Sequence, residues 1–242
     1  TWYQNAAEGG DKDAQRRLGD ALWRGELGLE IDLVAALTCF QNAAKGGNHY
    51  AKRRLGFAHE DDDFGVKIDL EVARTWLQEA AVDGDGDAQW LLGDAYEFGK
   101  DLGLKIDLQL ALDWYRKAAM GGDEDTQHRL AIAYEFSELG LAIDCQVALM
   151  WYRKAAEGGD GHAQDRLAEA YENGKLDLAT DEEKALKWLK KAAEGGNHFA
   201  QFRLAEAYEG GELGLLTDVK EALKWYQNAA EGAEAAAEGA EA

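Results

Sequence analysis

A repeat of about 37 residues constrains this chain more than any other feature. A block of the form Trp-x-x-x-Ala-Ala recurs along the 242-residue sequence at steps of 37 or 38 residues. Its first residue falls at Trp2, Cys39, Trp76, Trp114, Trp151, Trp188 and Trp225. A fixed period in this range is typical of solenoids, in which each repeat is a supersecondary unit that stacks on its neighbours. The sequence therefore predicts an array of about six repeats.

Each repeat has the pattern of two helices. In one copy Ala163, Leu167 and Tyr171 follow the spacing i, i+4, i+8, which places them on one helical face. An Asp or Asn stands before this first helix, where its side chain can accept hydrogen bonds from free backbone amides: Asp11, Asn48, Asp85, Asp123, Asp160 and Asn197. The second helix has its own recurring N-cap candidate: Asp32, Asp69, Asp107, Asp144, Asp181 and Asp218. The Gly-Gly pair between repeats suits a left-handed helix end.

Small and large apolar residues also recur at fixed places. Four residues after each second N-cap comes an Ala that lets a neighbouring helix approach closely: Ala36, Ala73, Ala111, Ala148, Ala185 and Ala222. We expect the Trp positions, with Cys39 in the place of one Trp, to be core rather than part of a cofactor site. Cys39 and Cys145 are about three repeats apart, so no disulfide is expected.

The combined pattern W-x-x-x-A-A-x-x-G followed by A-x-x-x-L-[GA]-x-A-Y resembles the Sel1-like repeat family of the tetratricopeptide superfamily. The likeness extends from Trp2 to about Gly232. It implies an all-α, right-handed superhelical solenoid of antiparallel helix pairs, about six repeats of 37 residues. It also implies a role as an adaptor in protein assemblies, and it carries no catalytic residues or cofactor.

Residues 1–232 are therefore expected to form one solenoid domain, followed by a low-complexity Ala/Glu/Gly tail at 233–242. The tail is compatible with a fraying helix, a linker or an artificial segment. The chain starts with Thr1, in the middle of a repeat, which favours a piece of a longer or processed protein. The compartment stays open: a soluble protein is expected, periplasmic or secreted if an upstream export signal has been removed.

The charge of the chain narrows the classes of partner. With 47 acidic and 26 basic side chains, the formal net charge is −21. A field of this sign repels phosphate, so binding of nucleic acid is not expected. No apolar run reaches the roughly 18 residues of a transmembrane helix, so no membrane insertion is expected. A protein or peptide partner remains, and the acidity favours a basic one.

Candidate binding residues lie at positions that the repeat does not dictate. In helical solenoids the first helix of each pair commonly lines the concave, binding surface. The position two before the recurring Leu holds Arg16, Arg53, Trp90, His128, Asp165 and Phe202, and the position four later holds Asp20, Phe57, Asp94, Ile132, Glu169 and Glu206. Exposed aromatic and Arg side chains are usual anchors of recognition. We select as the candidate concave face Arg16, Arg53, Phe57, Trp90, His128, Ile132 and Phe202. The alternative is that Trp90 and Phe202 pack on neighbouring helices.

A second row lies directly before the Leu: Arg17, Arg54, Leu91, Arg129, Arg166 and Arg203. This Arg row could bind the carboxylates of a partner. The stronger alternative is internal pairing, because Asp20, Glu169 and Glu206 follow their Arg by three residues, which is ion-pair spacing on a helix.

Signals for metal binding and catalysis are weak. Asp83, Asp85 and Asp87 resemble the start of a calcium loop, but the places for Gly and Glu hold Ala88 and Asp94. The acidic run at 61–63 has no ligand spacing. The five His residues follow no zinc pattern, and no phosphate-binding Gly loop is present. We expect neither a metal, nor a cofactor, nor enzyme activity.

The leading functional hypothesis is a non-catalytic scaffold that binds a peptide or protein on the concave surface. The alternative is a structural subunit that assembles with copies of itself through its ends or its acidic faces, into an extracellular or filamentous assembly for example. The net charge opposes such self-association unless salt or a cation screens it.

Overall fold

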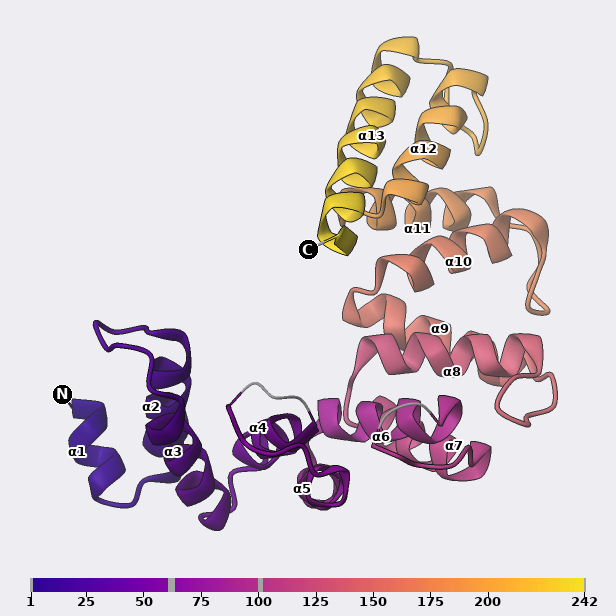
Figure 1. Cartoon of the computed structure of the whole chain (residues 1–242). Coiled ribbons are helices and arrows are strands. Elements are labelled where there is room, and N and C mark those ends of the chain that lie inside the picture. The colour runs from indigo at the N-terminus through magenta and orange to yellow at the C-terminus, as the bar shows by residue number, and fades with distance from the viewer. Residues whose placement is uncertain (1, 61–63, 100–101, 242) are drawn as a thin grey trace. The chain divides into compact units, whose positions relative to one another are not determined.

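The computed structural model describes residues 2–60, 64–99 and 102–241, and these residues form thirteen α-helices and no β-strand. The chain divides into two compact units, Thr1–Gly121 (unit 1) and Gly122–Ala242 (unit 2). Unit 1 holds α1 (Trp2–Glu8), α2 (Lys12–Arg24), α3 (Leu33–Lys45), α4 (His49–Glu60), α5 (Leu70–Val82), α6 (Gly86–Phe98) and α7 (Leu108–Met120) (Figure 1). Unit 2 holds α8 (Glu124–Phe136), α9 (Cys145–Gly158), α10 (Gly161–Asn173), α11 (Glu182–Glu194), α12 (His198–Gly210) and α13 (Val219–Glu241). Among the described residues no helix is long and apolar enough to cross a membrane.

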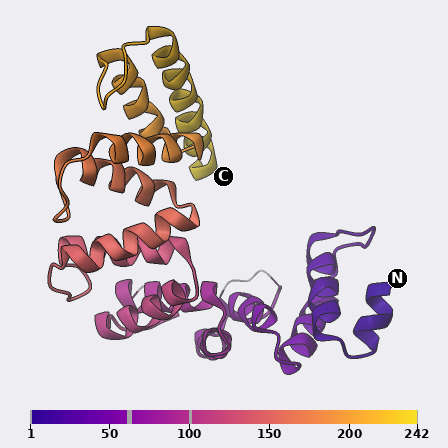
Figure 2. The ribbon, with the colours of Figure 1, turned by 180° about the vertical axis from the view of Figure 1, so that it is seen from behind.

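The helices alternate between two structural roles. We call the first helix of each pair the A helix (α2, α4 and α6 in unit 1; α8, α10 and α12 in unit 2) and the second the B helix. Each A helix packs most extensively on the B helix that follows it, and α3, α5, α9 and α11 also pack on the next A helix of their unit. The successive pairs are visible in the ribbon from both sides (Figure 2). The predicted all-α solenoid of helix pairs is confirmed.

The predicted helix caps are all present. Each recurring Asp or Asn side chain accepts a hydrogen bond from the backbone amide three residues further along the chain. The second glycine of each Gly-Gly pair has a positive φ, for example 80° at Gly47 and 92° at Gly196. Such a conformation strains any residue with a Cβ, which is why glycine ends these helices.

The core consists of columns of small and large apolar residues. The predicted Ala column is fully or almost fully buried in every repeat. The Trp side chains are less buried than expected: Trp76, Trp114, Trp188 and Trp225 are half-buried and pack on the edges of the core, and only Trp151 among the described Trp side chains is buried. Cys39 is also half-buried. The fully buried large side chain comes one residue later, as Phe40, Leu77, Tyr115, Tyr152 and Leu189.

The two units differ where this large side chain meets the A helix. In unit 1 the facing residue is a glycine, and a Cβ placed on Gly93 would lie 2.6 Å from the ring of Tyr115. Gly56 is in the same situation, 2.6 Å from Leu77. In unit 2 the corresponding residues are Ala131, Ala168 and Ala205, all fully buried. Helices in unit 1 therefore approach each other at glycine, whereas those of unit 2 meet at alanine.

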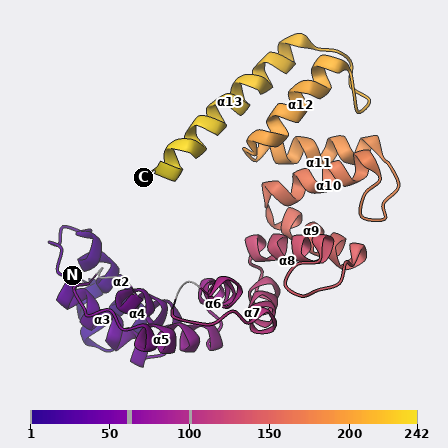
Figure 3. The ribbon, with the colours of Figure 1, turned by 45° about the vertical axis from the view of Figure 1, so that its right-hand side comes forward.

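The last B helix is longer than the others, as Figure 3 shows beside α12. Where α11 ends at the sequence Gly195-Gly196-Asn197, α13 has Gly232 followed by Ala and Glu at 233 and 234. The second glycine and the next N-cap are both missing, so nothing stops the helix. Residues 233–241 therefore continue α13. Of the forms that the sequence left open for this segment, the structure has the helix.

Candidate functional site

Two pockets lie at the same positions of different repeats. Each is lined by three A-helix residues that are four residues apart and by side chains of the next A helix, one in the first pocket and three in the second. At four equivalent places the residues are Arg16, Asp20, Arg24 and Tyr50 in unit 1, and His128, Ile132, Phe136 and His162 in unit 2. We call these four places the pocket positions. The repeat thus builds one kind of cavity twice and lines it with different chemistry.

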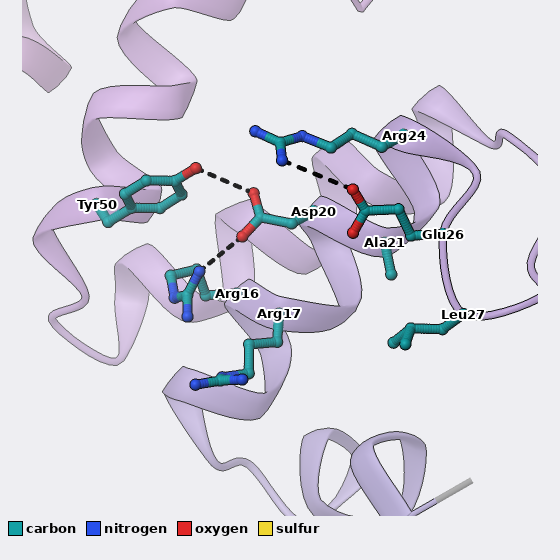
Figure 4. Close-up of a pocket in the computed structure, with 8 residues that line it drawn as sticks. All are labelled: Arg16, Arg17, Asp20, Ala21, Arg24, Glu26, Leu27 and Tyr50. Atoms are coloured by element: carbon teal, nitrogen blue, oxygen red, sulfur yellow. Dashed lines mark hydrogen bonds and ion pairs between the residues drawn. The ribbon is translucent and has the colours of Figure 1, made fainter.

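The Arg16 pocket in unit 1 has a volume of about 410 Å³. It lies along α2 and is completed by the loop after that helix and by Tyr50 on α4 (Figure 4). Its complete lining is Arg16, Arg17, Asp20, Ala21, Arg24, Glu26, Leu27 and Tyr50. Three Arg against two carboxylates make this lining cationic within an otherwise strongly acidic chain.

The Asp20 carboxylate is the centre of the Arg16 pocket. One of its oxygens accepts a hydrogen bond from Arg16 at 2.6 Å, and the other accepts one from the Tyr50 hydroxyl at 3.2 Å. The Arg16 guanidinium also lies over the Tyr50 ring, 5.1 Å from its centre. Burial, followed by the negative charge of Asp20, raises the pKa of Tyr50. Figure 4 shows Arg24 on the opposite side of Asp20 from Arg16. Arg24 is paired with Glu26 at 3.6 Å.

The His128 pocket in unit 2 has a volume of about 290 Å³ and a largely apolar, aromatic lining. His128, Ile132 and Phe136 come from α8, and the other lining residues are Tyr152, His162, Asp165 and Arg166. The rings of His128 and His162 are stacked nearly parallel, with their centres 5.9 Å apart. Phe136 is 57% exposed, so the pocket offers an open aromatic edge to the solvent.

Two half-buried ionisable groups, His128 and Asp165, line this second pocket. Burial lowers the pKa of His128, although Asp160, 3.6 Å away, pulls it in the opposite direction. Burial raises the pKa of Asp165, although its ion pair with Arg203 opposes that shift. Burial thus favours the uncharged form of His128, and the His128 pocket has more aromatic rings in its lining than the Arg16 pocket.

The other predicted residues of the face have various surroundings. Arg53 is engaged in the array: it pairs with Asp85 at 3.1 Å and Asp87 at 2.6 Å, both from the next repeat. Phe57 is half-buried on α4. Trp90 is 37% exposed on α6, and Phe202 is 48% exposed on α12, where its edge contacts the ring of Tyr226. Trp90 and Phe202 thus keep substantial open surface.

The Arg row is mainly part of the internal framework. Arg166 binds Glu135 of the preceding A helix as well as Glu169 of its own helix, and Arg203 binds Asp165 and Glu172 of the preceding A helix. Arg54 lies over the ring of Trp23, 3.9 Å from its centre. Internal pairing was predicted, but most of the partners come from the preceding repeat rather than from three residues further along the same helix.

The three aspartates of the calcium hypothesis have other partners. Asp83 pairs with Lys52, Asp85 caps α6 and binds Arg53, and Asp87 also binds Arg53. In the described ranges no group of three or more His, Cys, Asp or Glu side chains is placed to hold a metal ion. The acidic run at 61–63 lies outside the described residues.

Comparison with known proteins identifies the repeat. The sequence matches the model of the Sel1 repeat over residues 1–11, 12–48, 49–85, 86–123, 125–160, 161–197 and 198–233. The chain belongs to the Sel1 repeat family. Proteins built from Sel1 repeats generally mediate protein–protein interactions, and this repeat scaffold is typically non-catalytic. No curated protein shows significant sequence similarity to the chain.

Solved structures of Sel1 repeat proteins have the same fold. A Sel1 repeat protein from Oxalobacter formigenes is 31% identical, with a TM-score of 0.79 over 92% of this chain and 88% of that one. The protein c5321, a protective antigen present in uropathogenic Escherichia coli strains and displaying an SLR fold, is 35% identical, with a TM-score of 0.77 over 95% of this chain. This chain covers 48% of that antigen. The immunity protein PA5088 from Pseudomonas aeruginosa, at 19% identity and a TM-score of 0.53, shares the fold.

Two of the four pocket positions escaped the sequence analysis. The third position holds Arg24 in one pocket and Phe136 in the other, and the fourth holds Tyr50 and His162. Both positions vary between repeats, which is the signal that could have found them. The first two positions were predicted, and the structure places Arg16, His128 and Ile132 in pockets.

Proposed function

We propose that this Sel1 repeat protein is a non-catalytic scaffold that binds a peptide or protein segment along the A helices of its units. The observation that carries the proposal is the pair of equivalent pockets with different linings. The residues that maintain the repeat stay constant, whereas the pocket positions change from Arg, Asp, Arg and Tyr to His, Ile, Phe and His. Such variation suits recognition of a partner rather than support of the fold.

Exposed aromatic side chains on A helices support the proposal. Trp90, Phe136 and Phe202 are open to solvent on α6, α8 and α12. Large aromatic residues are frequent among the side chains that dominate binding energy at interfaces. The net charge of −21 favours a partner that is basic overall.

A peptide display experiment tests the proposed surface. Peptides selected on the wild-type chain would be measured against Trp90→Ala, Phe136→Ala and Phe202→Ala. We expect each change to weaken selected peptides by about tenfold, which corresponds to roughly 1.4 kcal/mol per anchor. Matched controls are Met120→Ala and Leu223→Ala, which remove exposed side chains from the B helices α7 and α13. Equal affinity for all three A-helix variants, or loss only in the B-helix controls, would overturn the proposal.

Self-assembly is the alternative proposal, and it makes a different prediction. A scaffold for a foreign partner should keep a mass near 26.5 kDa in light scattering at all protein concentrations. A self-assembling subunit should gain mass as protein concentration rises, and more strongly when salt screens the acidic faces.

A further inference from the structure

The Arg16 pocket differs in charge from the same place one repeat later. Arg53 occupies the pocket position of Arg16, and the next repeat neutralises it with the two carboxylates of Asp85 and Asp87. In the first repeat the residues corresponding to those two aspartates are Asn48 and Tyr50. Arg16 therefore lies over the ring of Tyr50 where Arg53 pairs with the carboxylate of Asp87, and the residue in the place of Asp85 is the neutral Asn48.

The ion pairs of the pocket leave N–H donors of Arg16 and Arg24 available. Among the side chains that the structure describes, Asp20 is the carboxylate paired with Arg16, and its two oxygens are shared between Arg16 and Tyr50. Arg24 and Glu26 are 3.6 Å apart, beyond hydrogen-bond distance, and both side chains are 54% exposed. An exposed pair of this kind contributes little and exchanges easily. A guanidinium carries five N–H donors, so Arg16 and Arg24 retain donors for a ligand.

We propose that the Arg16 pocket binds the carboxylate of an Asp or Glu side chain in the bound segment. This inference rests on the proposed scaffold function and specifies what one pocket recognises. A carboxylate fits because charge-assisted hydrogen bonds from Arg are strong and can be bidentate. The net charge of the chain does not prevent this, because at physiological salt charges beyond about 8 Å are largely screened. The partner can be basic overall and still insert one acidic side chain here.

Glutarate is a probe that isolates this chemistry from the rest of the interface. The ¹⁵N-labelled full chain would be titrated with glutarate at constant ionic strength and pH 7, with neutral glutaramide as the matched control. We expect saturable shifts of the Arg16 and Arg24 Nε–H signals with a dissociation constant of about 1–10 mM, as suits a ligand held by a few polar contacts. The Nε–H signal of Arg53 should stay unchanged. Absence of saturable shifts, or equal shifts at Arg53, would overturn the proposal.

Two variants exchange the residues beside Arg16 and Arg53, and a third serves as their control. Tyr50→Asp places beside Arg16 the kind of carboxylate that Asp87 places beside Arg53. This variant should weaken glutarate binding at least about tenfold. Tyr50→Phe keeps the neutral ring and should retain binding. The double variant Asp85→Asn with Asp87→Tyr does the reverse, and it should make the Arg53 signal respond to glutarate. Asn is a good N-cap, so this variant keeps the cap of α6. Unchanged glutarate affinity in Tyr50→Asp would contradict the proposal.

The glutarate and peptide experiments fail independently. If glutarate does not bind while selected peptides still depend on Trp90 and Phe202, only the carboxylate proposal falls. If glutarate binds as expected while the A-helix variants leave peptide affinity unchanged, the pocket recognises carboxylates but the scaffold proposal fails.

Discussion

Unit 1 and unit 2 use the same repeat with different internal chemistry. In unit 1, A helices meet their B helices at glycine, and Arg54 lies over the ring of Trp23. In unit 2, A helices meet at alanine, and Arg166 at the equivalent position holds Glu135. The Arg at this place of the repeat therefore has different neighbours in the two units, with a Trp ring beside Arg54 and the Glu135 carboxylate beside Arg166. Three comparisons between equivalent residues test how far the units differ.

The largest effect is expected at the Arg row. Arg166→Gln removes the main partner of Glu135. The Glu135 side chain is only 10% exposed, and it also accepts a hydrogen bond from the Tyr152 hydroxyl. We expect a loss of about 2–3 kcal/mol in the free energy of unfolding, because a nearly buried carboxylate is left without its cation. Arg54→Gln removes, among the contacts of Arg54, its stacking on the ring of Trp23, and it should cost less, about 1 kcal/mol. Urea unfolding of both variants measures the difference. Equal costs would show that the ion pair with Glu135 is worth no more to the fold than the contacts of Arg54.

A smaller effect is expected where the helices cross. Gly93→Ala places a methyl group against the buried ring of Tyr115, and overpacking of this kind costs about 1–3 kcal/mol, partly offset by the better helix propensity of alanine. Ala131→Gly in unit 2 should cost about 1 kcal/mol through loss of helix propensity and of one packed methyl group. Denaturant unfolding again provides the measurement. If Gly93→Ala stabilises the chain, the close approach at glycine is not required in unit 1.

The smallest effect is a pH dependence confined to unit 2. Burial lowers the pKa of His128 below its ordinary value of 6.5, although Asp160 and Asp125 oppose the shift and His162 adds to it. Above pH 6.5 the imidazole is neutral in the folded and unfolded chains, so stability is unaffected. As the pH falls below 6.5 the unfolded chain binds the proton first, and stability decreases. The equivalent position in unit 1 holds Arg16 and has no imidazole.

Unfolding measured between pH 7.5 and 5 in wild type and His128→Gln tests this expectation. The variant should lose less stability on acidification than the wild type. His49→Gln is the control, because that imidazole is exposed on α4 in unit 1, away from His128. An identical pH dependence in wild type and His128→Gln would assign the acid sensitivity to other groups.

The frame of the repeat could be predicted from the sequence because its requirements are local. An N-cap such as Asp85 bonds to an amide three residues away, and a Gly-Gly pair ends the helix that contains it. The place of Trp in the core was predicted less well. The repeat makes Trp the most recognisable residue, but the helix face that is fully buried contains the next residue, as at Tyr152.

The site was only partly predictable, because each pocket is completed by residues of the next repeat, whose register is not evident from the sequence. Arg16 and Asp20 lie on one helix, and their spacing shows that they share a face. Tyr50 comes from the following A helix, and the sequence alone does not say which of its residues lies opposite Arg16. The same limit applies to the Arg row, whose carboxylate partners lie mostly in the preceding repeat.

The separation between frame and pocket positions has an evolutionary consequence. The caps, the Ala column and the buried Leu residues determine whether a repeat folds, and none of them lines the Arg16 or the His128 pocket. Substitutions at the pocket positions are therefore close to neutral for folding while they change what is bound. Duplication and shuffling of whole repeats would then transfer a ready-made specificity from one place in an array to another.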